Sequence, residues 1–386
     1  MKVAIPKERR PDEARVAASP LTVGKLIDLG FDVVVETGAG DGAAIPDQAF
    51  ADAGATIAAD EAAALGDADI VFKVREPLRG GGDDPDELAL MKKGCVLVGL
   101  LSPMVDRDGA QAYATHGITA FALELLPRIT RAQTMDVLSS QSNLAGYRSV
   151  LDAAACFGRA FPMMMTAAGT VAPARVVVMG AGVAGLQAIA TARRLGAVVS
   201  AFDVRAAAKE QVESLGASFI EVPAEEGADG ETAAGYAKEM GEEYLKRQAE
   251  VIHQTLKKQD IAICTALIPG RPAPVLITED MVKDMAPGSV INDLAVEAGG
   301  NCPLSELGKV VVKHGVTIIG HANVPARIAV DASALYARNL LNFITPLVDG
   351  ETKALEIDWS DEIIQGTLLT RDGKVVHPLL TGEGTD

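Results

Sequence analysis

The segment from Arg175 to Asp203 constrains the fold more than any other part of the chain. It reads RVVVMGAGVAGLQAIATARRLGAVVSAFD, so an apolar β-branched run leads directly into Gly180-x-Gly182-x-x-Gly185 and a helical stretch. Gly180 permits a tight turn, Gly182 lets backbone approach a pyrophosphate, and Gly185 lets the helix pack on the strand. The free N–H groups and the dipole of a helix N-terminus favour an anion there. We therefore predict a Rossmann-type unit that binds a dinucleotide at Gly180–Gly185.

The acidic residue that ends the next predicted strand, Asp203, bears on the choice of dinucleotide. A carboxylate at this position accepts both hydroxyls of the adenosine ribose and repels a 2′-phosphate. Arg205 follows two residues later and favours the opposite choice, because an arginine can pair with a 2′-phosphate. The repulsion by Asp203 remains, so we predict NAD(H) rather than NADP(H).

Strand and helix patterns alternate along the whole chain, which is typical of parallel βαβ units. We predict an α/β protein with two doubly wound Rossmann-like domains in tandem and an NAD(H) cleft between them. The first predicted series of strands is Lys2–Ile5, Asp32–Glu36, Asp69–Val74, Cys95–Leu100 and Ala120–Leu123. The second is Val176–Met179, Val198–Phe202, Phe219–Val222, Ile261–Cys264, Val290–Asp293 and Thr317–Ile319. Helices in the first series are expected at Pro20–Leu29, with Ser19 as its N-cap, at Pro46–Ala53 and at Asp86–Lys93.

Two long helical stretches connect these series. Leu138–Phe161 reads as one helix from the first domain to the second, and Arg327–Asn342 reads as the return path. We therefore expect a discontinuous first domain, residues 1–137 and 325–386, and an inserted NAD(H)-binding domain, residues 138–324. The Asp-Gly pair in Arg371–Lys374 predicts a C-terminal β-hairpin, which we expect to protrude and to serve as a dimer contact.

Charge and cysteine content exclude several classes of function. The formal net charge of −17 argues against nucleic-acid binding, which needs a basic surface, and against unaided adsorption to anionic lipid. Scattered cysteines without zinc-type spacing predict reduced thiols and no metal site; they are Cys95, Cys156, Cys264 and Cys302. No stretch reads as a signal peptide or a transmembrane helix, so we expect a soluble, cytoplasmic protein.

Two further segments are candidates for ligand contacts. Residues 223–240 form a Gly-rich acidic stretch too long for an ordinary βα connection, and we interpret it as either a mobile lid or a solvated loop, with Tyr236 and Met240 able to pack on a nucleotide. Pro127–Arg148 reads PRITRAQTMDVLSSQSNLAGYR at the proposed domain junction. Its density of hydrogen-bonding side chains suits a nicotinamide and its ribose better than a linker, although a capped, solvated helix start remains the alternative.

Together these segments resemble the NAD(H)-binding component (domain I, as a separate soluble alpha subunit) of proton-translocating NAD(P) transhydrogenase. The resemblance covers essentially the whole chain and is highly specific. It rests on the segments Ile5–Pro20, Pro127–Arg148, Arg175–Asp203, Gly235–Tyr244, Thr265–Thr278 and Asn292–Asn301.

The resemblance implies that hydride passes from NADH on this chain to NADP⁺ on a partner subunit, coupled to proton translocation and Re/Si-specific. It implies a homodimer that associates with an NADP-binding beta subunit and membrane-spanning subunits, peripheral on the cytoplasmic face of the inner membrane. The residues around the nicotinamide, counted as catalytic, are Arg128, Gln133 and Asp136. The implied cofactor contacts are Arg128, Ile129, Gln133, Asp136, Ser139, Gly180, Gly182, Val183, Ala184, Gly185, Asp203, Val204, Arg205, Gly235, Tyr236, Gln248, Ala266 and Leu267.

Two other functions compete with this one. Alanine dehydrogenase is similar in fold, and Arg15 and Lys73 match its substrate-binding Arg and Lys. That enzyme also needs an acid–base histidine near the end of the strand at Cys95–Leu101, where this chain has none. We therefore expect Arg15 and Lys73 to serve packing, ion-pair or hydrogen-bonding roles, and we expect structural roles for His116, His253, His314, His321 and His377. The third possibility is a non-catalytic NAD(H)-sensing module, because the chain alone has no second hydride acceptor.

Overall fold

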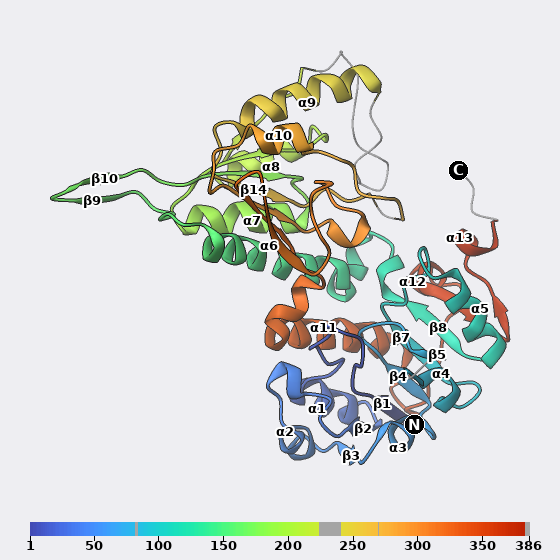
Figure 1. Cartoon of the computed structure of the whole chain (residues 1–386). Coiled ribbons are helices and arrows are strands. Elements are labelled where there is room, and N and C mark those ends of the chain that lie inside the picture. Colours follow the sequence, from blue (N-terminus) through green and yellow to red (C-terminus); the bar gives the residue numbers. More distant parts are fainter. Residues whose placement is uncertain (82–83, 224–240, 269, 383–386) are drawn as a thin grey trace. The chain divides into compact units, whose positions relative to one another are not determined.

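The computed structural model describes residues 1–81, 84–223, 241–268 and 270–382. The chain divides into two compact units (Figure 1). Unit 1 comprises Met1–Gln141 and Ala326–Asp386, and unit 2 comprises Ser142–Pro325. Each unit is built around its own sheet, and each is described by itself below.

Unit 1 contains an eight-stranded sheet in the order β19-β18-β8-β7-β4-β1-β2-β3. The strands from β8 to β3 are parallel, and β18 and β19 add antiparallel at one edge. Their bounds are β1 Lys2–Ile5, β2 Asp32–Glu36, β3 Thr56–Ala58, β4 Ile70–Phe72, β7 Val96–Gly99, β8 Thr119–Ala122, β18 Leu368–Arg371 and β19 Lys374–Val375. A separate two-stranded pair joins β5 (Arg79–Gly81) to β6 (Asp84–Asp86).

Helices cover both faces of this sheet. In β1, Val3 and Ile5 face one apolar cluster and Ala4 faces another, as expected for the alternating side chains of a strand. The first cluster includes residues of α1, α2 and α11, and the second includes residues of α3, α4 and α5. The bounds are α1 Pro20–Asp28, α2 Asp47–Asp52, α3 Glu61–Leu65, α4 Glu87–Leu90, α5 Arg107–His116, α11 Ala329–Ile344, α12 Glu362–Thr367 and α13 Pro378–Thr381.

Unit 2 contains a seven-stranded sheet in the order β13-β12-β11-β14-β15-β17-β16, in which only β16 is antiparallel to its neighbour. The strands are β11 Arg175–Met179, β12 Val198–Phe202, β13 Ser218–Phe219, β14 Ile261–Cys264, β15 Val290–Asp293, β16 Lys309–Lys313 and β17 Val316–Gly320. Helices α6, α7 and α8 contribute to the apolar cluster on one face, and α9 and α10 to that on the other. Their bounds are α6 Val137–Cys156, α7 Val183–Arg194, α8 Ala208–Ser214, α9 Glu242–Leu256 and α10 Glu279–Lys283. The predicted fold class, two doubly wound Rossmann-like domains, is confirmed.

The C-terminal hairpin forms at the predicted Asp-Gly turn, but the expectation that it protrudes is wrong. Its first strand, β18, pairs with β8, and Thr370 donates a hydrogen bond from its hydroxyl to the carbonyl of Ile118. Leu368 and Leu369 are buried. The hairpin therefore extends the sheet of unit 1, because its apolar residues are buried in the core of that unit.

A different hairpin projects from unit 2 (Figure 1). Strands β9 (Met164–Thr166) and β10 (Gly169–Val171) form an antiparallel ribbon whose residues are all exposed. The sequence patterns did not predict it, nor β3, β16 or the β5–β6 pair. The predicted helix Leu138–Phe161 ends earlier, at Cys156, because Phe157 and Phe161 turn into the core of unit 2. The strand expected at Phe219–Val222 is Ser218–Phe219, and α4 is shorter than the predicted Asp86–Lys93.

Candidate functional site

The glycine-rich turn connects β11 to α7 in unit 2 and leaves no space for side chains at two positions. Gly180 has φ +99°, a left-handed conformation that favours glycine. A Cβ at Gly185 would lie 1.8 Å from the carbonyl oxygen of Gly180, so the start of α7 packs directly on the turn. The Thr265 hydroxyl, just after β14, donates to that same carbonyl over 2.8 Å. The turn therefore has the predicted glycine geometry and is held from the neighbouring strand.

Gly182 differs from these two glycines because the space beside it is open. It is the N-cap of α7 and makes no side-chain cap, and a Cβ built on it would meet no atom of the described residues within 4 Å. Backbone N–H groups of the first helical turn lack partners within the helix, and they begin at Val183 and Ala184. Open space beside these donors fits a pyrophosphate at the predicted place. This is the observation that supports a bound dinucleotide.

Asp203 lies directly after β12, beside the turn, with its carboxylate almost completely buried. Ala181 donates its backbone N–H to Oδ2 over 2.7 Å, which ties the turn to the end of β12. Arg205 donates from its backbone N–H and from Nε to Oδ1, and from Nη2 to Oδ2, each over 2.9 Å. The sequence placed Asp203 and Arg205 together, but it did not indicate that the arginine holds the acid. Val204, between them, is partly buried against the apolar cluster of α9 and α10.

The loop after β14 contains the predicted residues Ala266 and Leu267. Ala266 is held on both sides by Asn301, which accepts from its N–H over 3.1 Å and donates to its carbonyl over 2.9 Å. Asn301 is in turn fixed by Asp293 at the end of β15, whose carboxylate accepts the Asn301 N–H. Leu267 is half exposed. Asn301 and Asp293 were not predicted as site residues, although both lie in the polar stretch after β15.

Helix α9 contains one predicted contact, Gln248, and one further side chain, Tyr244, that lies near Asp203. Gln248, a predicted contact, is buried, and its Oε1 atom has no hydrogen-bond partner within the described part of the chain. Tyr244 was not predicted individually; burial and the nearby Asp203 carboxylate raise the pKa of its phenol. The remaining predicted contacts, Gly235 and Tyr236, lie outside the described residues, as does nearly all of the predicted lid.

The other predicted residues belong to unit 1, on the 3₁₀ turn Thr130–Met135 and the start of α6. Arg128 and Gln133 are exposed and Ile129 is partly buried. Asp136 accepts the N–H of Ser139 over 2.9 Å and its hydroxyl over 2.5 Å, which caps the start of α6. Asp136 and Ser139 are therefore paired with each other. Arg128 and Gln133 are the side chains of this set that the fold leaves exposed.

Several polar residues of the same segment have structural roles instead. Arg131 forms an ion pair with Asp361 through both Nη atoms. Ser140 donates to the side chain of Asn339, and buried Gln141 bonds to Arg15. The polar side chains of this segment thus have two kinds of role. Some cap the start of α6 or are exposed, and others contact α11 and α12.

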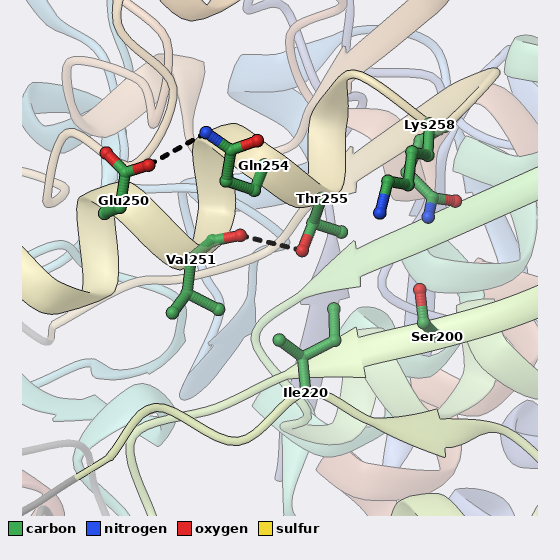
Figure 2. Close-up of a pocket in the computed structure, with 8 residues that line it drawn as sticks. Ser200, Ile220, Glu250, Val251, Gln254, Thr255 and Lys258 are labelled. Atoms are coloured by element: carbon green, nitrogen blue, oxygen red, sulfur yellow. Dashed lines mark hydrogen bonds between the residues drawn. The ribbon is translucent and has the colours of Figure 1, made fainter.

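A hollow elsewhere in unit 2 does not belong to this site. It has a volume of about 440 Å³, and Figure 2 shows it between β12 and the end of α9, where Ser200, Ile220 and Thr255 line it. Two polar side chains at its rim, Glu250 and Gln254, bond to each other over 2.8 Å. None of its lining residues is a predicted contact. Among the described residues there is also no cluster of three His, Cys, Asp or Glu that could hold a metal.

Known proteins are similar to this chain over its full length. The family described as "Alanine dehydrogenase/PNT" matches in both of its halves, its N-terminal domain at residues 4–145 and its C-terminal domain at residues 149–378. An NAD(P) transhydrogenase alpha subunit from Rhodospirillum rubrum is 65% identical over 384 residues, which is 100% of each chain. The crystal structure of transhydrogenase from Sinorhizobium meliloti has a TM-score of 0.87 and 52% identity, covering 97% of this chain and 100% of that one. The chain belongs to the family of NAD(P) transhydrogenase alpha subunits. L-alanine dehydrogenase is more distant, with a TM-score of 0.80 and 28% identity over 99% of this chain and 98% of that one.

The predicted transhydrogenase family is thus confirmed, and unit 1 shows how its chain departs from an alanine dehydrogenase site. Arg15 is buried and bonds to both carboxylate oxygens of Glu13 and to Gln141. Lys73 is 1% exposed and lies 3.2 Å from Glu8 and 2.9 Å from Glu87. Burial disfavours its charge, but the two carboxylates outweigh that effect and raise the pKa of Lys73. Both cations are already paired with carboxylates of the chain itself.

Other residues also occupy the place after β7 where alanine dehydrogenase is expected to have its catalytic histidine. After β7 the chain continues Leu100-Leu101-Ser102, and the Glu124 carboxylate accepts the N–H groups of Leu101 and Ser102. Burial raises the pKa of Glu124 to about 7. The histidines with described contacts are held by backbone or surface carboxylates elsewhere: His116 by Met91, His253 by Asp284, His314 by Glu279 and His377 by Gly366.

Proposed function

We propose that this chain binds NAD(H) in unit 2 and passes hydride between NADH and NADP⁺ bound on a partner subunit. The observation that carries this proposal is the open space beside Gly182 at an uncapped helix start, next to a buried acid at the end of β12. When bound, the nicotinamide supplies the hydride, and the protein supplies orientation and exclusion of water. Direct hydride transfer requires no side-chain nucleophile and no acid–base pair.

The choice of NADH follows from Asp203. The Ala181 N–H holds the Asp203 carboxylate beside the glycine-rich turn, where the acid would accept a ribose diol and would repel a 2′-phosphate. We expect the isolated chain to bind NADH well and NADPH poorly. A direct binding titration tests this, and equal affinities for the two would contradict it.

The nicotinamide end belongs in this proposal to Arg128, Gln133, Asp136 and Ser139, with Ile129 beside them. These residues and the unit 2 contacts are proposed to bind one nucleotide. The proposed domains are residues 1–137 with 325–386 and residues 138–324. Gly235 and Tyr236, which lie outside the described residues, are proposed as further nucleotide contacts. The Gln248 amide, buried with an orphaned Oε1, supports a ligand near α9.

The proposed partners follow from the names of the relatives, which are subunits of a transhydrogenase. The chain is proposed to work with an NADP-binding beta subunit, with Re/Si specificity and with protons crossing a membrane in other subunits. No helix in the described ranges of this chain is long and apolar enough to span a bilayer. Membrane association is proposed to be peripheral, on the cytoplasmic face, through the partner subunits that the names of the relatives imply.

A homodimer is the proposed state of the chain, and the β9–β10 ribbon supports it. An isolated two-stranded ribbon is marginally stable in water, and this one exposes Met163, Met164, Met165 and Val171. Clustered apolar side chains of this kind mark protein contacts. We expect a variant in which residues 163–171 are replaced by a short Gly-Ser turn to be monomeric by light scattering, while the intact chain is a dimer. Equal masses would contradict this role for the ribbon.

One set of mixing experiments separates the three candidate functions. A transhydrogenase requires an NADP-binding subunit, so reduction of an NADP⁺ analogue by NADH should appear only when that subunit is added. An alanine dehydrogenase would reduce NAD⁺ with alanine and no partner, and the pairing of Arg15 and Lys73 predicts no turnover. A sensing module would bind NADH and transfer no hydride under either condition.

A further inference from the structure

The Asp203 carboxylate has all of its usual acceptor positions filled. Two carboxylate oxygens offer about four lone-pair sites, and four hydrogen bonds of 2.7 to 2.9 Å reach them. Two come from backbone N–H groups, of Ala181 and Arg205, and these cannot leave without unfolding the turn. The other two come from the Arg205 guanidinium, which ends a flexible side chain.

A ribose diol needs two acceptor positions on this carboxylate, and only the guanidinium can vacate them. We infer that the Arg205 guanidinium is a releasable partner of Asp203, displaced by the adenosine ribose, and that it sets how strongly the chain discriminates NADH from NADPH. The inference rests on the proposed function, because it assumes that a dinucleotide binds at Asp203. The two backbone bonds keep the carboxylate in place when the guanidinium moves away.

The charges of Asp203 and Arg205 explain how the chain would discriminate NADH from NADPH. Asp203 alone would present an unbalanced negative charge to a 2′-phosphate, and at this depth, 6% exposed, water would screen it poorly. Arg205, 19% exposed, balances that charge, and its planar fork suits a phosphate as well as a carboxylate. Arg205 therefore has two opposed effects: it competes with the ribose of NADH, and it reduces the repulsion of NADPH.

Binding of NADH and NADPH to the full chain, measured by titration calorimetry, tests the inference with Arg205→Gln and Arg205→Lys. In Arg205→Gln we expect NADH to bind about threefold tighter and NADPH about fivefold weaker, the size of a partly exposed ion pair. Arg205→Lys keeps the charge without the fork, so its NADPH affinity should stay within about twofold of the unmodified chain. Arg194→Gln, an exposed arginine at the end of α7, removes the same charge away from Asp203 and should change neither affinity.

Thermal melting provides a second readout that does not depend on activity. Arg205→Gln should melt below the unmodified chain without nucleotide, and the difference should shrink when NADH is saturating, because Arg205 has then left Asp203 in the unmodified chain as well. An unchanged NADH-to-NADPH affinity ratio in Arg205→Gln, or weaker binding of NADH, would overturn the inference while leaving NAD(H) binding intact. An unmodified chain that binds no NADH would instead overturn the proposed function, and this inference with it.

Discussion

The two units share a fold but differ at the carboxyl ends of their strands, where open α/β sheets bind ligands. In unit 2 this edge presents Gly182 beside open space and an uncapped helix start. In unit 1 the corresponding edge is occupied by the chain's own charges, with Arg15 on Glu13 and Lys73 between Glu8 and Glu87. The two units thus share one architecture, but at this edge unit 2 leaves space for a ligand and unit 1 fills the space with its own ion pairs. Fold alone therefore does not locate a site, whereas the residues at the strand ends do.

Removal of Lys73 should have the largest effect, and it tests whether the edge of unit 1 is structural. Lys73→Met leaves Glu8 and Glu87 buried without their cation, and we expect a loss of about 3 to 5 kcal/mol in the free energy of unfolding. Urea denaturation followed by Trp359 fluorescence measures it, because the single tryptophan packs on the core of unit 1. Lys25→Met, which breaks the exposed pair with Asp28, is the control and should cost under about 1 kcal/mol. Similar losses in both variants would contradict a closed, structural edge.

Filling the open space beside Gly182 should weaken NADH binding strongly without affecting the fold. Gly182 has φ −75°, which any residue adopts, and the methyl group of Gly182→Ala meets no atom within 4 Å in the described part of the chain. We expect NADH affinity to fall about 100-fold, because the methyl group occupies the place of the pyrophosphate, while the melting temperature is unchanged. Gly158→Ala, also in open space, is the matched control. Undiminished NADH affinity in Gly182→Ala would show that the nucleotide lies elsewhere.

The edge of unit 1 should also make that unit sensitive to pH. Burial raises the pKa of Glu124 from 4.5 to about 7, so the folded state binds the proton more tightly than the unfolded state. The resulting stability is present below pH 4.5 and is lost as pH rises through about 7. The free energy of unfolding of unit 1 should therefore fall between pH 5 and pH 8. We expect this fall to be smaller in Glu124→Gln by on the order of 2 kcal/mol. Urea unfolding followed by Trp359 fluorescence measures this stability at each pH. An equal fall in stability in Glu124→Gln and in the unmodified chain would show that Glu124 is not its cause.

The smallest expected effect concerns the exposed residues of unit 1 that are proposed to meet the nicotinamide. Gln133→Asn shortens an exposed side chain of the 3₁₀ turn without disturbing buried contacts. We expect unchanged NADH affinity and about tenfold slower hydride transfer in a single turnover with the NADP-binding subunit, because positioning is impaired. Thr134→Ser, at the exposed neighbouring position, should transfer hydride at the unmodified rate. A normal rate in Gln133→Asn would remove this residue from the proposed site.

Features with local causes were predictable from the sequence. The turn at Gly180–Gly185 depends on glycine sterics and the adjoining apolar strand, and Ser19 caps α1 through a capping box with Thr22. Strand ends such as β1 and β14 follow from short apolar runs. In each case the residues that decide the structure are neighbours in sequence.

Features that depend on distant partners could not be predicted. Arg131 looks like a ligand-binding residue, but it pairs with Asp361, far along the chain. The C-terminal hairpin was recognised from its turn, yet its position depends on β8, which no local pattern reveals. Arg205 likewise looks like a phosphate partner in the sequence, whereas in the structure its guanidinium donates two hydrogen bonds to Asp203.

The way unit 1 is assembled from two stretches of chain has a consequence for its biogenesis. Helix α11 buries Tyr336 and Phe343 in the core of unit 1, and β18 covers the edge of β8. The ribosome synthesises these elements only after all of unit 2, residues 142–325, has emerged. Domains fold as units during synthesis, so unit 2 can fold while the first half of unit 1 still exposes an incomplete apolar surface. Residues 1–141 therefore precede unit 2 in synthesis but complete their core after it, and in that interval their exposed apolar surface favours aggregation.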